Sequence, residues 1–201
     1  MQLLNKNIHC LGITEANLRA GADIEEVNIP GYTLVWDGGR ENKVKANSRV
    51  IAYIREDLSF EVVKVMMEDN LMPELWLRVG HKGTRRTLIG FIYREHSPWG
   101  VQEGTVKEQE GRWDKWLEAR RNTWSGTDEV FMLGDINLDM QRNDDPRYRN
   151  RKMIQNLCSE LVDKGWVQLI KEVTHYTNRA GLTSESLIDH VWTNRPAGRK
   201  S

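Results

Sequence analysis

The chain has 201 residues, 39% of them hydrophobic, which is enough to bury one sizeable core and too few for two. It carries 29 basic and 29 acidic residues, so its formal net charge is zero and no overall positive field marks it as a nucleic-acid-binding protein. Its two cysteines, Cys10 and Cys158, lack CxxC spacing and an accompanying histidine pair, which argues against a disulfide framework and a zinc site. We expect a single domain, residues 1–201, in a reducing, intracellular compartment.

The first half of the chain predicts a series of short strands. Residues 1–7 have the pattern of the end of a helix. Apolar and β-branched runs bounded by turn residues then predict strands at residues 8–13, 31–36, 49–55, 60–67, 74–79 and 87–93. Because no long helix pattern separates these strands, they favour an antiparallel or mixed sheet.

The second half of the chain adds helices and further strands. Apolar residues at helical spacing and short apolar runs predict helices at 101–123 and 149–165 and strands at 129–133 and 186–192. The longest expected loops are residues 20–29, 94–104 and 139–149. This order of elements predicts a layered α/β fold in which sheets pack inside helices.

The sequence predicts neither a membrane span nor a leader peptide. No stretch approaches the ~20 apolar residues that cross a bilayer. Residues 1–6 also lack the apolar segment of a signal peptide. We therefore expect a soluble protein that makes no contact with membranes.

Two features of the sequence, its short basic runs and its tryptophans, each allow two interpretations. Short basic runs are either solvated faces or parts of a local basic rim around a cleft, and they lie at residues 85–86, 120–121 and 147–152. Eight tryptophans are unusual, and those at 113, 116 and 124 lie near a basic pair where they could stack on bases. We expect packing in a core to be their use, because aromatic side chains serve burial first.

Three acidic residues stand at the ends of expected buried strands. Glu15 follows Leu-Gly-Ile-Thr, Asp135 follows Val-Phe-Met-Leu-Gly, and Asp189 lies within Ser-Leu-Ile-Asp-His. Because strand ends in α/β folds converge on a common crevice, these carboxylates can meet around one metal ion or one phosphate. Their oxygens suit Mg²⁺ or Mn²⁺, which bind one or two carboxylates together with phosphate oxygens of the substrate. Spacing alone explains the three acids equally well as unrelated turn or capping residues.

The tetrapeptide Gly-Asp-Ile-Asn at residues 134–137 favours the catalytic interpretation. After a buried strand, Gly134 permits a tight backbone, and Asp135 can accept a proton from an attacking water. Asn137 points the same way as Asp135 and can hold a phosphate oxygen. The tetrapeptide resembles the Gly-Asp-Phe/Leu-Asn signature of the endonuclease/exonuclease/phosphatase superfamily, which includes abasic-site endonucleases and the nicking enzymes of retrotransposons.

Three further segments carry the same resemblance, in the order and with the gaps of the superfamily. Leu-Gly-Ile-Thr-Glu-Ala at 11–16 resembles the strand that ends in the metal-binding Glu, and Gly-Phe-Ile-Tyr-Arg at 90–94 resembles the strand that ends in the active-site Tyr. Ser-Leu-Ile-Asp-His-Val-Trp-Thr-Asn at 186–194 resembles a segment common in the endonuclease domains of non-LTR retrotransposons. The resemblance implies a four-layer α/β/β/α sandwich of the deoxyribonuclease-I-like type.

The resemblance also implies catalytic and metal-binding roles. Glu15 and Asp135 would ligate Mg²⁺ or Mn²⁺, and Asp135 would also orient or deprotonate the attacking water. Tyr93 would stabilise negative charge that develops on phosphate oxygens, a task for a positioned donor. Asp189 would lie near the metal as a further catalytic residue.

Substrate contacts are implied for Asn137, which would hold the scissile phosphate, and for Arg94 beside the active-site Tyr. His190 is a different case, because the catalytic His of the superfamily belongs to a later Ser-Asp-His motif. On a strand, His190 would face away from Asp189, so we expect it to be structural.

Both ends of the superfamily domain are expected to be missing from this chain. Members begin with a strand whose Asn binds near the metal, whereas residue 1 already lies in the expected helix that follows it. They end with the strand that carries Ser-Asp-His, and this chain stops at Ser201 before such a motif. We therefore expect the sandwich to lack its first and last strands, and activity of this piece alone is an open question.

The implied function is metal-dependent hydrolysis of phosphodiesters, namely DNA nicking by a retrotransposon-like element. Such an enzyme would act on chromosomal DNA in the nucleus, with a reverse transcriptase domain elsewhere in a longer polyprotein. One alternative is a phosphatase of the same fold, and another is an inactive or domesticated fragment that acts only as a binding module. Activity that requires Mg²⁺ and Asp135 would separate the enzyme from the binding module.

Overall fold

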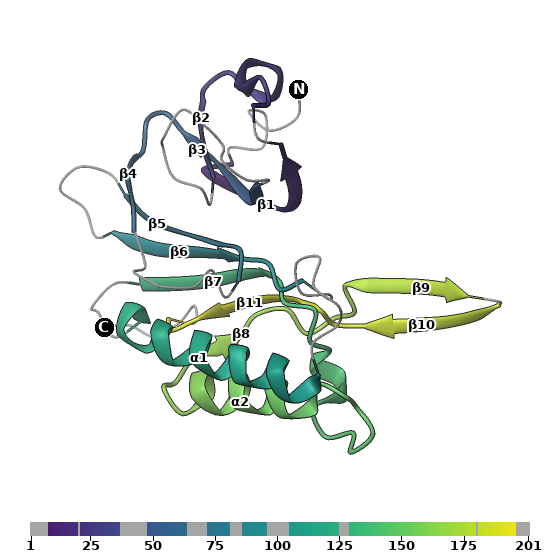
Figure 1. Cartoon of the computed structure of the whole chain (residues 1–201). Coiled ribbons are helices and arrows are strands. Elements are labelled where there is room, and N and C mark those ends of the chain that lie inside the picture. Colours follow the sequence, from purple (N-terminus) through teal and green to yellow (C-terminus); the bar gives the residue numbers. More distant parts are fainter. Residues whose placement is uncertain are drawn as a thin grey trace.

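Two β-sheets lie face to face, and two α-helices cover the outer side of the larger sheet (Figure 1). The computed structural model describes residues 8–19, 21–36, 48–63, 72–80, 86–95, 105–124, 129–179 and 181–195. The expected α/β sandwich is therefore confirmed, while the helix end expected at residues 1–7 lies outside the described residues. Within the described part of the chain, no helix is long and apolar enough to cross a membrane.

The smaller sheet is antiparallel and has the strand order β1-β3-β2. Its strands are β1 (Cys10–Leu18), β2 (Tyr32–Trp36) and β3 (Ser48–Arg55). The central strand β3 is buried on both faces, which explains its continuous apolar run. Residues around the 3₁₀ helix η2 (Ile24–Val27) pack on the outer face of this sheet, so the loop expected at 20–29 contains a helical turn.

The larger sheet has six strands in the order β4-β5-β6-β7-β11-β8. The strands are β4 (Ser59–Val62), β5 (Glu74–Gly80), β6 (Thr87–Ile92), β7 (Glu129–Asp135), β8 (Val167–Gln168) and β11 (Asp189–Thr193). The strand expected at 60–67 is thus shorter, and residues 64–67 lie outside the described residues. β6 and β7 run parallel, and helix α1 lies between them in sequence because parallel neighbours need a crossover connection.

Both expected helices are present with different ends. α1 (Val106–Trp124) begins with a capping box, in which the Glu108 N–H donates to Oγ1 of Thr105 and the Thr105 N–H donates to Oε2 of Glu108. Residues 101–104 of the expected helix lie outside the described residues. α2 (Arg151–Val162) is shorter at both ends than expected, and Gly165 follows it with a φ of +76°.

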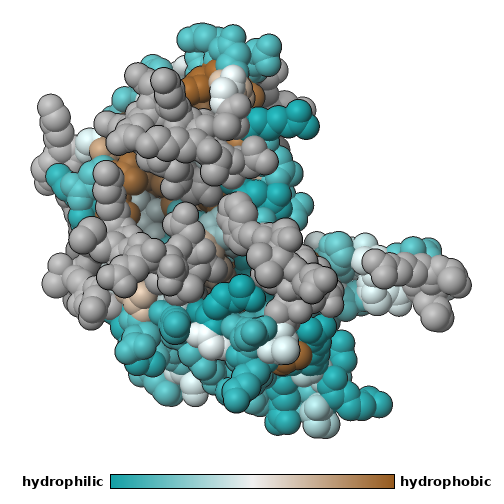
Figure 2. All heavy atoms as spheres, viewed as in Figure 1, coloured by the Kyte–Doolittle hydropathy of each residue, from teal (hydrophilic) through white to brown (hydrophobic). Residues whose placement is uncertain are grey.

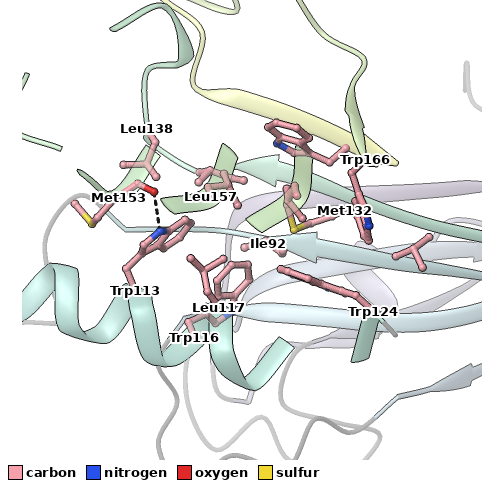
Figure 3. Close-up of a cluster of buried hydrophobic side chains, with 14 of the residues drawn as sticks. Ile92, Trp113, Trp116, Leu117, Trp124, Met132, Leu138, Met153, Leu157 and Trp166 are labelled. Atoms are coloured by element: carbon pink, nitrogen blue, oxygen red, sulfur yellow. Dashed lines mark hydrogen bonds between the residues drawn. The ribbon is translucent and has the colours of Figure 1, made fainter. Parts of the chain in front are cut away.

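Tryptophans fill the interface between the larger sheet and the helices (Figure 3). Trp113, Trp116 and Trp124 on α1 are buried, and Trp113 stacks on Trp116 with ring centroids 5.0 Å apart. The indole N–H of Trp113 donates to the carbonyl oxygen of Met153 on α2 at 2.9 Å, which ties the two helices together. The expected packing role of these three tryptophans is confirmed.

One of the expected surface arginines lies inside the molecule. Arg120 on α1 is 1% exposed and forms an ion pair with Glu74 of β5, so it belongs neither to a solvated face nor to a basic rim. Arg121, beside it, is exposed and pairs with Glu160 of α2 at 2.9 Å. Arg120 and Arg121 differ in exposure because consecutive residues of a helix point in different directions.

A hairpin projects from one end of the larger sheet (Figure 1). It consists of β9 (His175–Arg179) and β10 (Leu182–Ser186), and its described surface is largely hydrophilic (Figure 2). The sequence predicts a single strand at 186–192, but Ser186 ends β10, and β11 begins at Asp189. The loop expected at 139–149 also contains a 3₁₀ helix, η3 (Met140–Arg142).

Candidate active site

The candidate site lies where strand ends of the two sheets meet. Asp135 ends β7 and Asp189 begins β11, and the antiparallel register places these two residues directly opposite each other. The hydroxyl of Tyr93, immediately after β6, donates to Oε1 of Glu15 on β1 at 2.5 Å, although 78 residues separate them in sequence. The negative charge of Glu15 also acts on Asp135. The structure thus brings together four of the expected residues, from both sheets.

The Gly-Asp-Ile-Asn segment owes its course to two residues with positive φ. Gly134 has a φ of +146°, and a Cβ at this position would lie 1.9 Å from the carbonyl oxygen of Ile92. Asn137 has a φ of +52°, in the left-handed region that Asn tolerates better than most residues. Its backbone N–H donates to Oδ1 of Asp135 at 3.0 Å, so the turn itself holds one oxygen of the carboxylate.

Asp135 lies in a concentration of negative charge. Burial raises its pKa to about 6, and the carboxylates of Asp189 and Glu15 add to the rise. The hydrogen bond from the N–H of Asn137 and the electrostatic interaction with His175 lower this pKa. A carboxyl group with a pKa near 6 releases and accepts a proton close to neutral pH, which suits a general base.

Arg94 holds the segment from inside the protein. It is 7% exposed, its Nη1 donates to the carbonyl oxygen of Asn137 at 3.1 Å, and burial lowers its pKa. In return, Nδ2 of Asn137 donates to the carbonyl oxygen of Arg94 at 2.8 Å. The backbone N–H of Arg94 donates to the carbonyl oxygen of Asp135 at 2.9 Å. A direct contact with substrate, as the resemblance implies, would require this guanidinium to leave the interior.

Asp189 is fixed by a residue to which the motifs assign no role. Oγ1 of Thr174 accepts the backbone N–H groups of Ile188 at 3.2 Å and Asp189 at 3.1 Å. The next residue, His175, is exposed and begins β9 close enough to influence the charge of Asp135. The sequence signal for both residues is weak, because their link to the site depends on how the hairpin returns to β11.

Glu15 stands in a bulge that sequence patterns do not predict. β1 continues to Leu18, five residues past the end of the strand expected at 8–13, and Glu15 and Asn17 have φ values of +55° and +50°. The left-handed conformation costs a residue with a Cβ about 1–2 kcal/mol, so contacts elsewhere must stabilise it. The carboxylate of Glu15 is exposed except for its hydrogen bond with Tyr93.

Tyr93 joins this bulge to the rest of the site. Burial, followed by the hydrogen bond to Glu15, raises its pKa to about 12, so the hydroxyl stays protonated at neutral pH. Nη2 of Arg49 on β3 donates to the Tyr93 hydroxyl oxygen at 3.1 Å. Arg49 belongs to none of the four motifs, and it reaches the site because β3 pairs with β1.

His190 is buried and faces away from the carboxylates. It is 1% exposed, with Nε2 2.8 Å from the carbonyl oxygen of Leu138 and Nδ1 accepting the indole N–H of Trp192 at 3.3 Å. Burial lowers its pKa, and these partners suit a neutral imidazole. The geometry therefore agrees with the structural role expected for it.

A divalent cation fits the chemistry of the site. Among the described residues, no group of three or more His, Cys, Asp and Glu side chains is arranged to hold a metal ion by itself. Mg²⁺ does not require such a group, because it keeps several waters and binds one or two carboxylates plus phosphate oxygens. Burial and the repulsion among Glu15, Asp135 and Asp189 raise the pKa of Asp135, and a cation would relieve that repulsion. Glu15 and Asp135 remain the expected ligands.

Several solved structures have the same fold as this chain. The endonuclease domain of TRAS1, a telomere-specific non-LTR retrotransposon, has a TM-score of 0.62 at 12% identity, over 95% of this chain and 75% of that one. An endonuclease/exonuclease/phosphatase family protein from Leptotrichia buccalis gives 0.53 at 12% identity, over 96% and 78%. D. rerio TDP2 complexed with a single-strand DNA product gives 0.57 at 12% identity, over 99% and 76%.

Comparison by sequence finds no relative. No protein-family model matches the chain, and no curated protein matches it. At identities of 12%, the structural similarity establishes the fold and leaves the activity to be argued from the site. The chain has the α/β sandwich fold of the endonuclease/exonuclease/phosphatase superfamily, as its four motifs predict.

Proposed function

We propose that the chain is a divalent-metal-dependent phosphodiester hydrolase that nicks DNA. The observation that carries this proposal is the opposition of Asp135 and Asp189 on β7 and β11, with Glu15 brought toward them from the other sheet. Three side chains from strands β1, β7 and β11, together with Tyr93 directly after β6, form a set that contains a candidate base, a candidate metal ligand and a hydrogen-bond donor. Such a set is typical of hydrolysis at phosphorus.

Asp135 is the proposed base. Its pKa of about 6 leaves it ionised at neutral pH yet able to accept a proton as water attacks the phosphorus. The new P–O bond forms while the bond to the leaving oxygen breaks, and the phosphate oxygens gain negative charge. A bound Mg²⁺ or Mn²⁺ would supply Lewis-acid stabilisation of that charge. Tyr93 keeps its proton, so its hydroxyl can donate a hydrogen bond either to Glu15 or to a phosphate oxygen.

Asn137 is the proposed holder of the scissile phosphate. One hydrogen of its side-chain amide is donated to the carbonyl oxygen of Arg94, and a second N–H remains on the same nitrogen for a phosphate oxygen. Because Arg94 anchors both the carbonyl oxygen and the amide of Asn137, we propose that it acts on substrate through Asn137. Asp189, held by Thr174, keeps the electrostatic environment of Asp135 fixed.

The choice of DNA as substrate rests on the hairpin beside Asp189. β9 and β10 are polar, project from the site end of the sheet and expose 64% of Tyr176 (Figures 1 and 2). An element of this shape can follow a polymer, whereas it offers no enclosed pocket for a small phosphate monoester. The TRAS1 domain belongs to a retrotransposon and the TDP2 structure holds a DNA product, which supports the same choice.

One segment of the chain points to a biological setting for the proposed nuclease. The segment at 186–194 resembles that of non-LTR retrotransposon nucleases, and the TRAS1 domain has a similar fold. We therefore propose that the chain nicks chromosomal DNA in the nucleus for a retrotransposon-like element. A reverse transcriptase domain in a longer polyprotein would then use the nick.

The test is nicking of supercoiled plasmid with Mg²⁺, with Mn²⁺ and with a chelator. Asp135→Asn should lower the rate by roughly 10²-fold or more, the usual contribution of a general base. Asp163→Asn is the matched control, because Asp163 is an exposed carboxylate at the far end of α2 and should leave the rate unchanged.

The outcomes separate the possible functions. Nicking that disappears with chelator and in Asp135→Asn supports the proposal. Binding of DNA without nicking, by wild-type protein shown to be folded, would instead support a binding module. Hydrolysis of p-nitrophenyl phosphate without nicking would indicate a phosphatase.

A further inference from the structure

Arg49 occupies a special place opposite the bulge of β1. Thr14 pairs with Val50 and Leu18 pairs with Ser48, so residues 15–17 of β1 face the single residue Arg49 of β3. Two of those residues, Glu15 and Asn17, have the left-handed conformation. Arg49 is therefore the residue of β3 that lies opposite all three residues of the bulge.

The guanidinium of Arg49 contacts three groups around the bulge. One of its nitrogens donates to Oδ1 of Asn17, and Nη2 donates to the hydroxyl oxygen of Tyr93 at 3.1 Å. Its Nε lies 2.9 Å from Oε1 of Glu95, which follows β6. The cation also stands over the Tyr93 ring, 5.0 Å from the centroid. These contacts join β1, β3 and the end of β6 at one charged group.

The contact with Tyr93 has a directional consequence for Glu15. Because Arg49 donates to the hydroxyl oxygen, it occupies a lone pair and leaves the hydroxyl hydrogen to point elsewhere. That hydrogen is donated to Oε1 of Glu15. Arg49 thus acts on both sides of the bulge, directly on Asn17 and through Tyr93 on Glu15.

We propose that Arg49 is a positioning residue that holds the β1 bulge and thereby sets the direction of the Glu15 carboxylate for metal binding. This inference rests on the proposed function, in which Glu15 is a ligand of the divalent cation. Groups that orient metal ligands commonly change metal affinity or activity by roughly 10–100-fold when they are removed. In this assignment Arg49 acts on the metal ligand through Asn17 and Tyr93.

Arg55 on the same strand shows what an ordinary surface pair looks like. Its side chain is 23% exposed, against 22% for Arg49, and it pairs with Asp57 only two residues away. Asp57 is 52% exposed, whereas Glu95, the partner of Arg49, is 15% exposed. Arg55 is therefore a matched control: same residue type, same strand and similar exposure, but joined to a local turn.

The experiment measures Mn²⁺ binding by calorimetry, with the metal alone and no DNA. Arg49→Gln should weaken Mn²⁺ binding by roughly 10–100-fold, while Arg55→Gln should bind as the wild type does. Arg49→Lys should also be weakened, because an ammonium cannot present the planar fork that reaches several partners at once. Arg49→Gln combined with Tyr93→Phe should weaken Mn²⁺ binding by less than the product of the two single effects, because part of the effect of Arg49 reaches Glu15 through Tyr93.

Nicking assays give a second readout. The rate constant kcat of Arg49→Gln should fall at fixed Mg²⁺ and recover in part as Mg²⁺ is raised, with KM for DNA unchanged. If Arg49→Gln only weakened the fold, it would lower the midpoint of thermal unfolding, and kcat would not recover as Mg²⁺ is raised.

The results distinguish this inference from the proposed function. Wild-type protein that binds Mn²⁺ but does not nick DNA would sink the proposed function, while a weakened Arg49→Gln would still support the role of Arg49. Equal Mn²⁺ affinity in wild type, Arg49→Gln and Arg49→Lys would overturn the inference. So would the absence of Mn²⁺ binding by the folded wild type.

Discussion

Asp135 and Asp189 lie directly opposite each other on the antiparallel strands β7 and β11, so two carboxylates share one edge of the sheet. Like charges this close oppose joint ionisation, and the electrostatic effect of Asp189 follows burial as a cause of the raised pKa of Asp135. The arrangement is unfavourable for the folded state without a cation. It is useful for catalysis, because it supplies a base near neutral pH and an affinity for positive charge.

Neutralising Asp135 should stabilise the protein at pH 8 in the presence of a chelator. The folded state raises the pKa of Asp135 from 3.8 to about 6, so the folded state favours the protonated form and loses stability as pH rises through that range. Each pKa unit corresponds to 1.36 kcal/mol, and solvent screening of this half-buried group reduces the expected gain for Asp135→Asn to about 1–2 kcal/mol. Urea unfolding at pH 8 and pH 4 measures it.

The pH dependence is the control within that experiment. At pH 4 the wild-type carboxyl is largely protonated in the folded state, so the gain in free energy of unfolding should shrink toward zero. Addition of Mg²⁺ at pH 8 should also narrow the gap by stabilising only the wild type. A mutant that is less stable than wild type at pH 8 would contradict this account of the charge cluster.

Gly134→Ala should destabilise the fold by about 3 kcal/mol or more. The added Cβ would lie 1.9 Å from the carbonyl oxygen of Ile92, and the φ of +146° is one that alanine rarely adopts. Gly111→Ala on α1 is the matched control, because nothing lies within 4 Å of its added Cβ. That change should stabilise the helix by about 1 kcal/mol. Thermal unfolding of both variants measures the pair, and equal effects would refute the steric argument.

The sequence predicts the framework of the site because strand ends carry strong local signals. A buried apolar run followed by Gly-Asp, as at Asp135, marks both the end of a strand and a side chain at its edge. The roles expected for Glu15, Tyr93 and Asp189 follow from the resemblance of their motifs, and the structure brings these residues together where strand ends of the two sheets meet. Local pattern and global fold agree here, as they do in most natural sequences.

The parts that sequence does not predict depend on contacts between distant residues. The bulge after Thr14 has no local signal, because neither Glu15 nor Asn17 is a glycine. The hairpin strands β9 and β10 lack apolar alternation, and their described side chains belong to none of the core clusters. The inward direction of Arg94 follows from its partners on Asn137, which no residue pattern reveals.

Glu74→Gln should destabilise the protein by about 3–5 kcal/mol. Oε2 of Glu74 accepts from the indole nitrogens of Trp76 at 2.9 Å and Trp116 at 3.0 Å and from Nε of Arg120 at 2.8 Å. Burial already lowers the pKa of Arg120 to about 10, and removal of the carboxylate charge leaves a buried cation without this partner. The free energy of urea unfolding measures the loss.

Arg121→Gln is the comparison for that variant. Arg121 is 54% exposed and pairs with Glu160, so its removal should leave the free energy of unfolding close to the wild-type value. A loss below 1 kcal/mol for Glu74→Gln as well would show that the tryptophan packing, and not the buried ion pair, stabilises this interface.

Thr174→Val should lower both stability and the rate of nicking, because it removes the hydroxyl oxygen that accepts hydrogen bonds from two backbone N–H groups. The N–H groups of Ile188 and Asp189 lie 3.2 and 3.1 Å from Oγ1 of Thr174, and loss of that acceptor should cost about 1–3 kcal/mol. Thr174→Ser keeps the oxygen and should retain most of the stability and activity. If Thr174→Val nicks plasmid at the wild-type rate under conditions where it is fully folded, then the backbone at Asp189 needs no such anchor, and the hairpin serves the substrate alone.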